Sequence, residues 1–184
     1  MAVVNGLEVN SIGQMVEGVK RNPASAQATF FATTFWKGAF HNEADISNFN
    51  VGGAKLKHVE TFKIEGDHPK ELLGTDKGPA SVEVLLAALG HCIASGWATY
   101  GAFLGVPIEN LRVEVEGDID LQGMLGLPEP GKVRAGYLNI RVIHYVKSAA
   151  PREKLEQVKK MAEDLSPTKD SLRAVNYTSR LIAE

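Results

Sequence analysis

The alternation of hydrophobic and polar residues along the chain predicts short helices and antiparallel strands. Ser11 to Arg21 carries apolar residues at helical spacing, and Ser11 with Gln14 matches a capping box, so we expect a short helix there. The segment that follows is rich in β-branched and aromatic residues and is broken by glycines. This pattern predicts three antiparallel strands, over residues 27–36, 40–50 and 56–65.

The most apolar part of the chain follows a polar loop and predicts a long central helix from Ser81 to Leu104. Its hydrophobic residues cover well over half of the circumference at helical period, so we expect it to be buried on most sides. Ser81 is expected to cap this helix. Glu83 would then occupy its second position, where a carboxylate complements the helix dipole.

The second half of the chain predicts two paired strands, a helix and a last strand. Residues 111–121 alternate between apolar and charged side chains, as in a strand with one face in the core and one in water. A loop rich in glycine and proline separates them from a partner strand over 137–147. A helix then opens at Pro151 and is interrupted by Pro167, and residues 177–182 form the last strand.

Strands that cluster in this way, instead of alternating with helices, indicate an α+β fold with mostly antiparallel sheet. No repeat, low-complexity tract or linker divides the sequence, so we interpret residues 1–184 as a single domain. Its parts are an N-terminal helical extension (1–25), a β-meander (26–66), the central helix (79–105) and a β-β-α-β half (109–184).

Composition and charge exclude several classes of protein. The apolar fraction of 44% and the charged fraction of 23% are those of a soluble globular chain, not of a disordered or fibrous one. A net charge of −2 argues against nucleic-acid binding. The N-terminus lacks a basic region followed by an apolar stretch, so we expect a cytoplasmic protein without a membrane partner.

Cys92 is the one cysteine of the chain, which excludes an internal disulfide and a cysteine-rich zinc site. It lies on the apolar stripe of the predicted central helix, where a free cysteine is most often a small inert hydrophobic residue. No Lys or Arg is near it in sequence, so a lowered thiol pKa requires groups from distant segments. The adjacent His91 points about 100° away around a helix, and we place it at a surface or an interface.

Other groups of polar residues carry little chemistry. The acidic face of the strand over 111–121 includes Asp118 and Asp120, but such a face is usually solvated, and we expect no metal there. His144 falls on the apolar face of its strand and is interpreted as a satisfied core or interface histidine. The sequence contains no phosphate-binding or dinucleotide-binding motif, so no cofactor is expected.

The segment from Gly78 to Cys92 resembles the OsmC/Ohr family, the osmotically inducible and organic hydroperoxide resistance proteins. The likeness continues through Gly105–Leu121, Pro151–Leu155 and Leu165–Pro167, and Trp36–Gly38 with His41–Asn42 is similar to a subgroup with an extra N-terminal helix. The resemblance implies an OsmC-like α+β fold, with antiparallel sheets around the long central helices of an intertwined homodimer. It places the active sites at the subunit interface.

The resemblance also implies thiol-dependent reduction of organic or hydrogen peroxides. Cys92 matches the peroxidatic cysteine of the family, and Glu83 matches the carboxylate that orients an arginine over the thiolate. The expected arginine segment holds Lys37, His41 and Glu43 instead, so His41 is the candidate to assist the thiol. Ser166 stands where members with a full cycle carry a resolving cysteine, which makes this a single-cysteine member and calls for an external thiol as reductant.

Geometry leaves two arrangements of this site open. On an unbroken helix the nine-residue step from Glu83 to Cys92 is a rise of about 13.5 Å, too far for a shared site, so either the helix breaks or the groups meet across a dimer. Two other functions also remain open: a non-catalytic protein that holds a small apolar ligand in the interface cleft, and a hydrolase. The hydrolase reading has Cys92 as nucleophile and needs His41, His91 or His144 within about 3 to 3.5 Å of the sulfur.

Overall fold

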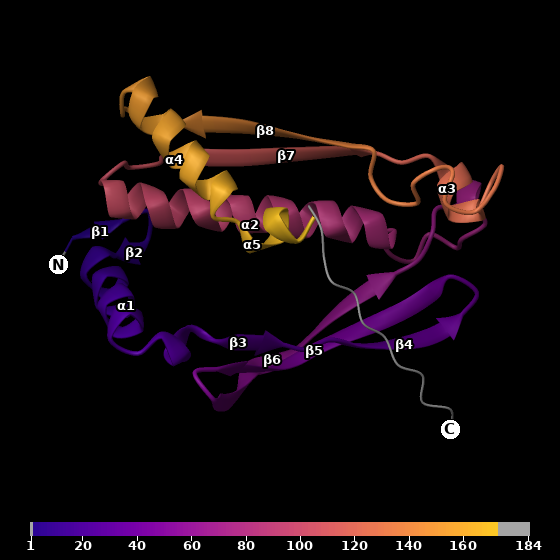
Figure 1. Ribbon diagram of the computed structural model, residues 1–184, viewed down its shortest axis with the longest axis horizontal. Coiled ribbons are helices and arrows are strands. Elements are labelled where there is room, and N and C mark those ends of the chain that lie inside the picture. Colours follow the sequence, from indigo (N-terminus) through magenta and orange to yellow (C-terminus); the bar gives the residue numbers. More distant parts are fainter. Residues whose placement is uncertain (1, 173–184) are drawn as a thin grey trace. The chain divides into compact units, whose positions relative to one another are not determined.

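A computed structural model describes residues 2–172, which form two compact units. The first unit comprises residues 9–85, and the second comprises residues 2–8 together with the chain from residue 86 onward. Helix α2 (Ser81–Leu104) begins in the first unit and continues into the second (Figure 1). The strand predicted over 177–182 lies outside the described residues.

The first unit is built on an antiparallel sheet with β5 (His41–Val51) at its centre. It pairs with β6 (Ala54–Gly66) across a turn at Gly52-Gly53, where both φ angles are positive. Glycine adopts that backbone conformation without a steric penalty, which explains the tight turn. β5 also pairs with β3 (Ala28–Phe30) and β4 (Thr33–Gly38).

Two predictions for this unit differ from the structure. The strand expected over 27–36 is divided into β3 and β4, because the two pieces pair with opposite ends of β5 and do not keep one register. The N-terminal helix α1 (Val9–Arg21) begins before Ser11, so this residue lies inside the helix and does not cap it. A short turn, η1 (Pro23–Ala26), follows α1, and η2 (Lys70–Leu72) lies in the loop before α2.

Helix α2 is continuous, but most of its apolar surface is not covered. Its buried residues are Leu89, Ile93, Trp97, Gly101 and Ala102. Val82, Leu85 and Phe103 keep 40%, 37% and 59% of their surface exposed, so the prediction of burial on most sides is wrong for one chain. By length and composition the helix would be able to cross a membrane, and 17% of its most apolar stretch is buried.

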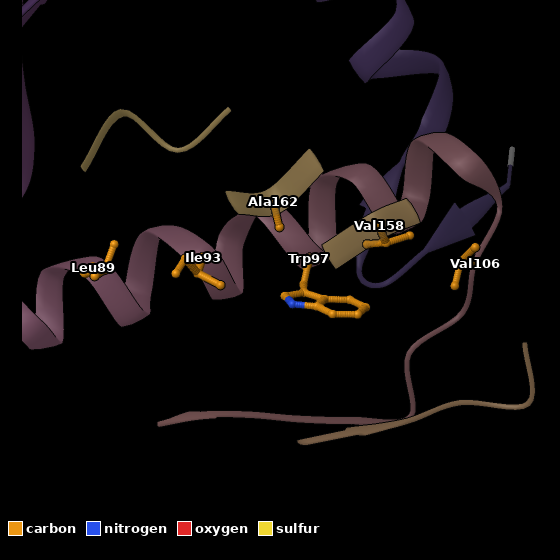
Figure 2. Close-up of a cluster of buried hydrophobic side chains, with 6 residues drawn as sticks. All are labelled: Leu89, Ile93, Trp97, Val106, Val158 and Ala162. Carbon is orange, nitrogen blue, oxygen red and sulfur yellow. The ribbon is translucent and has the colours of Figure 1, made fainter. Parts of the chain in front are cut away.

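The second unit packs α2 against a two-stranded antiparallel sheet and helix α4 (Arg152–Asp164). The strands are β7 (Asn110–Asp118) and β8 (Asn139–Lys147), as the sequence predicts apart from their ends. Figure 2 shows the buried cluster, which is formed by Leu89, Ile93 and Trp97 of α2, Val106 of the segment that follows α2, and Val158 and Ala162 of α4. Gly96 allows this packing, since a Cβ there would lie 2.9 Å from the Cα of Ala162.

Three smaller elements complete the second unit. Helix α3 (Leu121–Leu125) is capped by Asp120, whose side chain accepts a hydrogen bond from the backbone of Gln122. The strand predicted to reach residue 121 therefore ends at Asp118. Strands β1 (Val3–Val4) and β2 (Leu7–Glu8) form a hairpin, and α5 (Pro167–Ser171) follows α4 after a sharp turn, as the proline predicts.

Candidate functional site

The sulfur of Cys92 lies against the turn between α4 and α5. Ser166 Oγ donates a hydrogen bond to Cys92 Sγ over 3.1 Å. The serine is buried and is the N-cap of α5, where its Oγ also accepts from the backbone N–H of Lys169 at 3.1 Å. One short turn thus fixes a hydroxyl beside a partly exposed thiol.

The local sequence explains this turn. Pro167 lacks a backbone N–H and suits the first position of a helix, so the chain ends α4 and starts α5 at Ser166-Pro167. Thr168 is then the second residue of α5, where no earlier residue of that helix accepts its backbone N–H. Its backbone and its side chain both form hydrogen bonds to the Cys92 sulfur. Three donors from one turn therefore converge on the thiol.

These donors decide the ionisation of Cys92. Burial by itself raises the pKa of the thiol, but the hydrogen bonds from Ser166 and from Thr168 outweigh it and hold the pKa below its ordinary value. The donors are neutral groups, and they come from a segment far along the chain, as the sequence requires. The arrangement lowers the pKa of the thiol without a cationic side chain from the described part of the second unit.

A cavity of about 320 Å³ lies in the second unit beside this turn. Its walls are mostly apolar and come from α2, β8, α4 and the end of α5: Leu89, Ile93, Ile140, Val142, Glu163, Lys169 and Leu172. Leu89 and Ile93 flank Cys92 in sequence, and the backbone of Lys169 bonds to Ser166. The cavity therefore lies next to the turn that bonds to Cys92, although Cys92 is not among its lining residues, and its apolar walls suit a molecule with an apolar body.

His144 is a satisfied core histidine, as predicted from its strand position. Its side chain is 4% exposed, and Trp97 Nε1–H donates to its Nδ1 over 2.9 Å. Since Nδ1 accepts this bond, Nε2 carries the ring proton and donates to Glu163 Oε1 at 2.8 Å. Both ring nitrogens are thus occupied, and His91 is exposed on α2, so neither histidine of the second unit is placed as a base for the Cys92 thiol.

Glu83 and His41 lie in the first unit and have other partners. Glu83 is the third residue of α2, not the second, and its carboxylate accepts the backbone N–H of Ala80 at 2.8 Å. This is the glutamate half of a capping box, so Ser81 does not cap the helix. His41 Nε2 lies 2.8 Å from Glu65 Oε2 on the neighbouring strand β6.

The continuity of α2 excludes one of the two proposed arrangements, a break in the helix between Glu83 and Cys92. The helix does not break between Glu83 and Cys92. Nine residues of α-helix separate the two Cα atoms by a rise of about 13.5 Å. Glu83 and Cys92 of the same chain therefore do not share a site.

Sequence reasoning missed the buried Asp67 in the loop before α2. Its carboxylate accepts hydrogen bonds from the backbone of His68, Thr75 and Lys77 and from the Thr75 hydroxyl. The Thr75 hydroxyl is the largest influence on this carboxyl, and with the backbone donors it holds the pKa of Asp67 far below its usual range despite burial. A lone Asp in a polar loop gives no periodic signal, which is why the pattern did not reveal it.

The acidic face of β7 is used in ion pairs. Arg141 on β8 bonds to Glu116 at 3.0 Å and to Asp118 at 2.6 Å. Asp120, the other candidate, caps α3. Over residues 2–172 no group of three or more metal-ligating side chains comes together.

Comparisons with known proteins agree with this architecture. Residues 74–179 match the family model described as OsmC-like protein. Similar solved structures include an OsmC like protein from Mycoplasma pneumoniae, which is 17% identical with a TM-score of 0.61 over 80% of this chain and 89% of that one. No curated protein sequence matches the chain significantly.

Two further structures carry more specific names. An organic hydroperoxide resistance protein OsmC from Legionella pneumophila is 15% identical, with a TM-score of 0.52 over 79% of this chain and 89% of that one. An organic hydroperoxide resistance protein from Elizabethkingia anophelis is 14% identical, with a TM-score of 0.54 over 79% and 88%. At these identities the likeness establishes a shared fold.

Proposed function

We propose, since this chain belongs to the OsmC-like protein family, that it reduces hydroperoxides through Cys92 and takes its electrons from an external thiol. The observation that carries this proposal is the set of donors around the sulfur, led by the 3.1 Å hydrogen bond from Ser166. The thiolate is the nucleophilic form of cysteine, so groups that lower the thiol pKa increase the reactive fraction near neutral pH. The same donors remain in place to stabilise charge on the sulfur as it reacts.

The first step is attack of the Cys92 thiolate on an oxygen of the peroxide. The S–O bond forms as the O–O bond breaks, and the released alkoxide takes a proton to leave as an alcohol. Sulfur is oxidised to a sulfenic acid, and the peroxide is reduced by two electrons. No metal or organic cofactor is needed for this step.

Regeneration requires thiols from outside the chain, because Ser166 replaces a second sulfur. A first thiol condenses with the sulfenic acid, which releases water and leaves a mixed disulfide on Cys92. A second thiol then attacks the mixed disulfide, releases the reduced Cys92 and leaves as the oxidised disulfide. Electrons and protons balance with two thiols consumed for each peroxide.

The apolar cavity favours organic over hydrogen peroxide as the substrate. Leu89, Ile93, Ile140 and Val142 offer a hydrocarbon surface in a space of about 320 Å³. Burial of apolar surface contributes about 25 cal/mol per Å², which an aryl or alkyl peroxide gains and hydrogen peroxide does not. We therefore propose a peroxide with a compact apolar body.

A homodimer is the second part of the proposal. The exposed apolar side chains of α2, among them Val82, Leu85 and Phe103, make a surface that a second copy would cover. In such a dimer Glu83 and His41 of one protomer would complete the Cys92 site of its partner. Glu83 then has two tasks, because it already accepts the Ala80 backbone N–H at the start of α2.

Peroxide consumption tests the proposal directly. Purified protein is given cumene hydroperoxide or hydrogen peroxide with dithiothreitol, and wild type is compared with Cys92→Ser and Ser166→Ala. We expect Cys92→Ser to be inactive, and Ser166→Ala to be slower by several-fold at pH 7, because it removes one donor to the thiolate. Equal rates for wild type and Cys92→Ser would overturn the proposal.

The cavity also supports a second candidate, a protein that binds a small apolar ligand without chemistry. In that case Cys92 has no chemical role and is only part of the surroundings of the binding site, so Cys92→Ser would bind the ligand as wild type does. Native mass spectrometry with cumyl alcohol, the reduced form of the probe, separates the two. Binding that is indifferent to Cys92, together with no peroxide turnover, favours the binding protein.

A further inference from the structure

His144 and Glu163 take no part in the proposed peroxide chemistry, yet they connect the core of the second unit to the turn beside Cys92. His144 lies on β8 and is held between Trp97 at Nδ1 and Glu163 at Nε2. Glu163 lies near the end of α4. The histidine thus joins the central helix, the sheet and α4 through two hydrogen bonds made by one ring.

Glu163 reaches the donor-bearing turn through both its backbone and its side chain. Its carbonyl accepts the backbone N–H of Ser166 at 3.4 Å. Its carboxylate lies 3.9 Å from Lys169 Nζ, and the backbone N–H of Lys169 donates to Ser166 Oγ. A shift of the end of α4 would therefore also shift the hydroxyl that bonds to Cys92.

We propose that His144 and Glu163 form a positioning pair, which fixes the end of α4 to the sheet and so holds Ser166 and Thr168 against the Cys92 sulfur. The inference rests on the proposed function of Cys92 but concerns residues that take no part in the attack on the peroxide. Hydrogen bonds weaken steeply with distance and angle, so a shift of about 1 Å in the turn removes much of the effect of its donors. Loss of the pair is expected to lower the thiolate fraction of Cys92.

The pair also depends on the protonation of His144. A proton on Nδ1 would face the Trp97 N–H, donor against donor, and break that bond. Burial lowers the pKa of His144, while the carboxylates of Glu163 and Glu156 raise it and Lys159 lowers it; the net pKa is below its ordinary value. Glu163 also faces the ammonium groups of Lys159 at 3.5 Å and Lys169 at 3.9 Å. The ring is therefore neutral at pH 7 and the pair is intact.

The rate of alkylation of Cys92 by iodoacetamide provides the test, because the reagent reports on one thiol in this chain. We compare wild type with Glu163→Ala, Glu163→Gln and, as a matched loss of charge on α4, Glu156→Ala. At pH 7 we expect Glu163→Ala to react about 3- to 10-fold more slowly, since about tenfold in thiolate corresponds to one unit of thiol pKa. Glu163→Gln keeps an acceptor for Nε2–H and should stay within about twofold, as should Glu156→Ala.

A measurement on intact protein keeps the proposal testable if Glu163→Ala does not fold. In a Trp36→Phe background the remaining indole N–H signal belongs to Trp97, and its pH dependence in NMR reports protonation of His144. That signal gives the midpoint pH of His144 protonation. Below this midpoint we expect the alkylation rate of Cys92 to fall with pH more steeply than the roughly tenfold per pH unit of a lone thiol. Glu163→Gln should lower the midpoint, because the carboxylate no longer favours the cation.

The outcomes separate this inference from the proposed function. A wild-type thiol that titrates like an ordinary free cysteine would count against the proposed peroxidase and leave nothing to position. A reactive wild-type thiol with the same rate in Glu163→Ala would overturn the positioning pair alone. The positioning pair would also be overturned if the alkylation rate kept the same dependence on pH above and below the pH at which the Trp97 signal reports protonation of His144.

Discussion

Ser166 Oγ lies 3.1 Å from Cys92 Sγ, although the two residues are 74 positions apart. The side-chain oxygen of the serine occupies the place from which a second sulfur would attack a sulfenic acid. A chain with this geometry has the position for an internal disulfide and lacks only the second thiol. Ser166 differs from a cysteine at this position by one atom.

Ser166→Cys is therefore expected to convert the protein into one that closes an internal disulfide. After one equivalent of cumene hydroperoxide, Cys92 and the new thiol should bond, because a disulfide needs its two sulfurs about 2.05 Å apart and little movement is required. Mass spectrometry of the oxidised variant should show a loss of about 2 Da that dithiothreitol restores. Ser171→Cys, on an exposed residue at the other end of α5, is the matched control and should not close. Failure of Ser166→Cys to form the bond would contradict the geometry of the turn.

This proximity shows what sequence reasoning reached and what it missed. The alternation of residues in β7 and β8 predicted the paired strands, since side chains of a half-buried strand must alternate. No local pattern links Cys92 to Ser166 or Thr168, because their contact depends on how α4 folds back along α2. The resemblance to a family marked Ser166 as the position of a resolving cysteine, while its role as a donor to Cys92 was seen only in the structure.

The burial of α2 was mispredicted for a different reason. Apolar residues around most of a helix indicate that it will be buried. They do not indicate whether the residues that cover it belong to the same chain. Val82 and Leu85 are apolar as a core helix requires and are 40% and 37% exposed in one copy. A periodic pattern carries no information on whether the covering surface is intramolecular.

A homodimer predicts that the mass in solution will be about twice the 19.9 kDa of one chain. Sedimentation equilibrium of wild type is compared with Val82→Lys and with Leu125→Lys, which alters an exposed apolar residue on α3. Burial of an aliphatic side chain contributes about 1.5 to 3 kcal/mol, and a symmetric dimer loses it twice, so Val82→Lys should raise the dissociation constant at least about tenfold. Monomeric wild type at micromolar concentration would remove the dimer from the proposal.

Asp67 predicts a pH-dependent contribution to stability. Its pKa is depressed in the folded protein, chiefly by the Thr75 hydroxyl, so the stabilisation is present above the ordinary aspartate pKa of about 3.9 and is lost as pH falls below it. Asp67→Asn should melt several degrees lower than wild type at pH 7, because an amide is a poorer acceptor for the four donors.

The difference between wild type and Asp67→Asn should narrow below about pH 4, where the wild-type carboxylate begins to lose its advantage. Thermal unfolding followed by circular dichroism at pH 7, 5 and 3.5 measures it. Asp76→Asn, an exposed carboxylate in the same loop, serves as the control and should change little at any pH. A constant difference across the series would mean that the charge of Asp67 is not what orders the loop.

Two glycines of α2 make a matched test of how closely this helix and α4 pack. A Cβ on Gly96 would lie 2.9 Å from the Cα of Ala162 and 3.0 Å from its Cβ, and both atoms belong to a residue on the buried face of α4. A Cβ on Gly90 would meet Val115 Cγ2 at 3.5 Å, an ordinary contact. Both positions are helical, so alanine gains up to about 1 kcal/mol of intrinsic propensity at either one.

Alanine should therefore destabilise the protein at Gly96, where steric strain outweighs the gain in helix propensity, but not at Gly90. We expect Gly90→Ala to be neutral or stabilising, and Gly96→Ala to lower the free energy of unfolding by about 1 to 3 kcal/mol, the usual cost of overpacking a core. Urea unfolding at pH 7 measures both. Because Ser166 lies just beyond the helix that Gly96→Ala would displace, this variant should also alkylate more slowly at Cys92. Equal stabilities for the two variants would show that α4 moves aside, and the close approach of α2 to α4 would then not be what holds the turn in place.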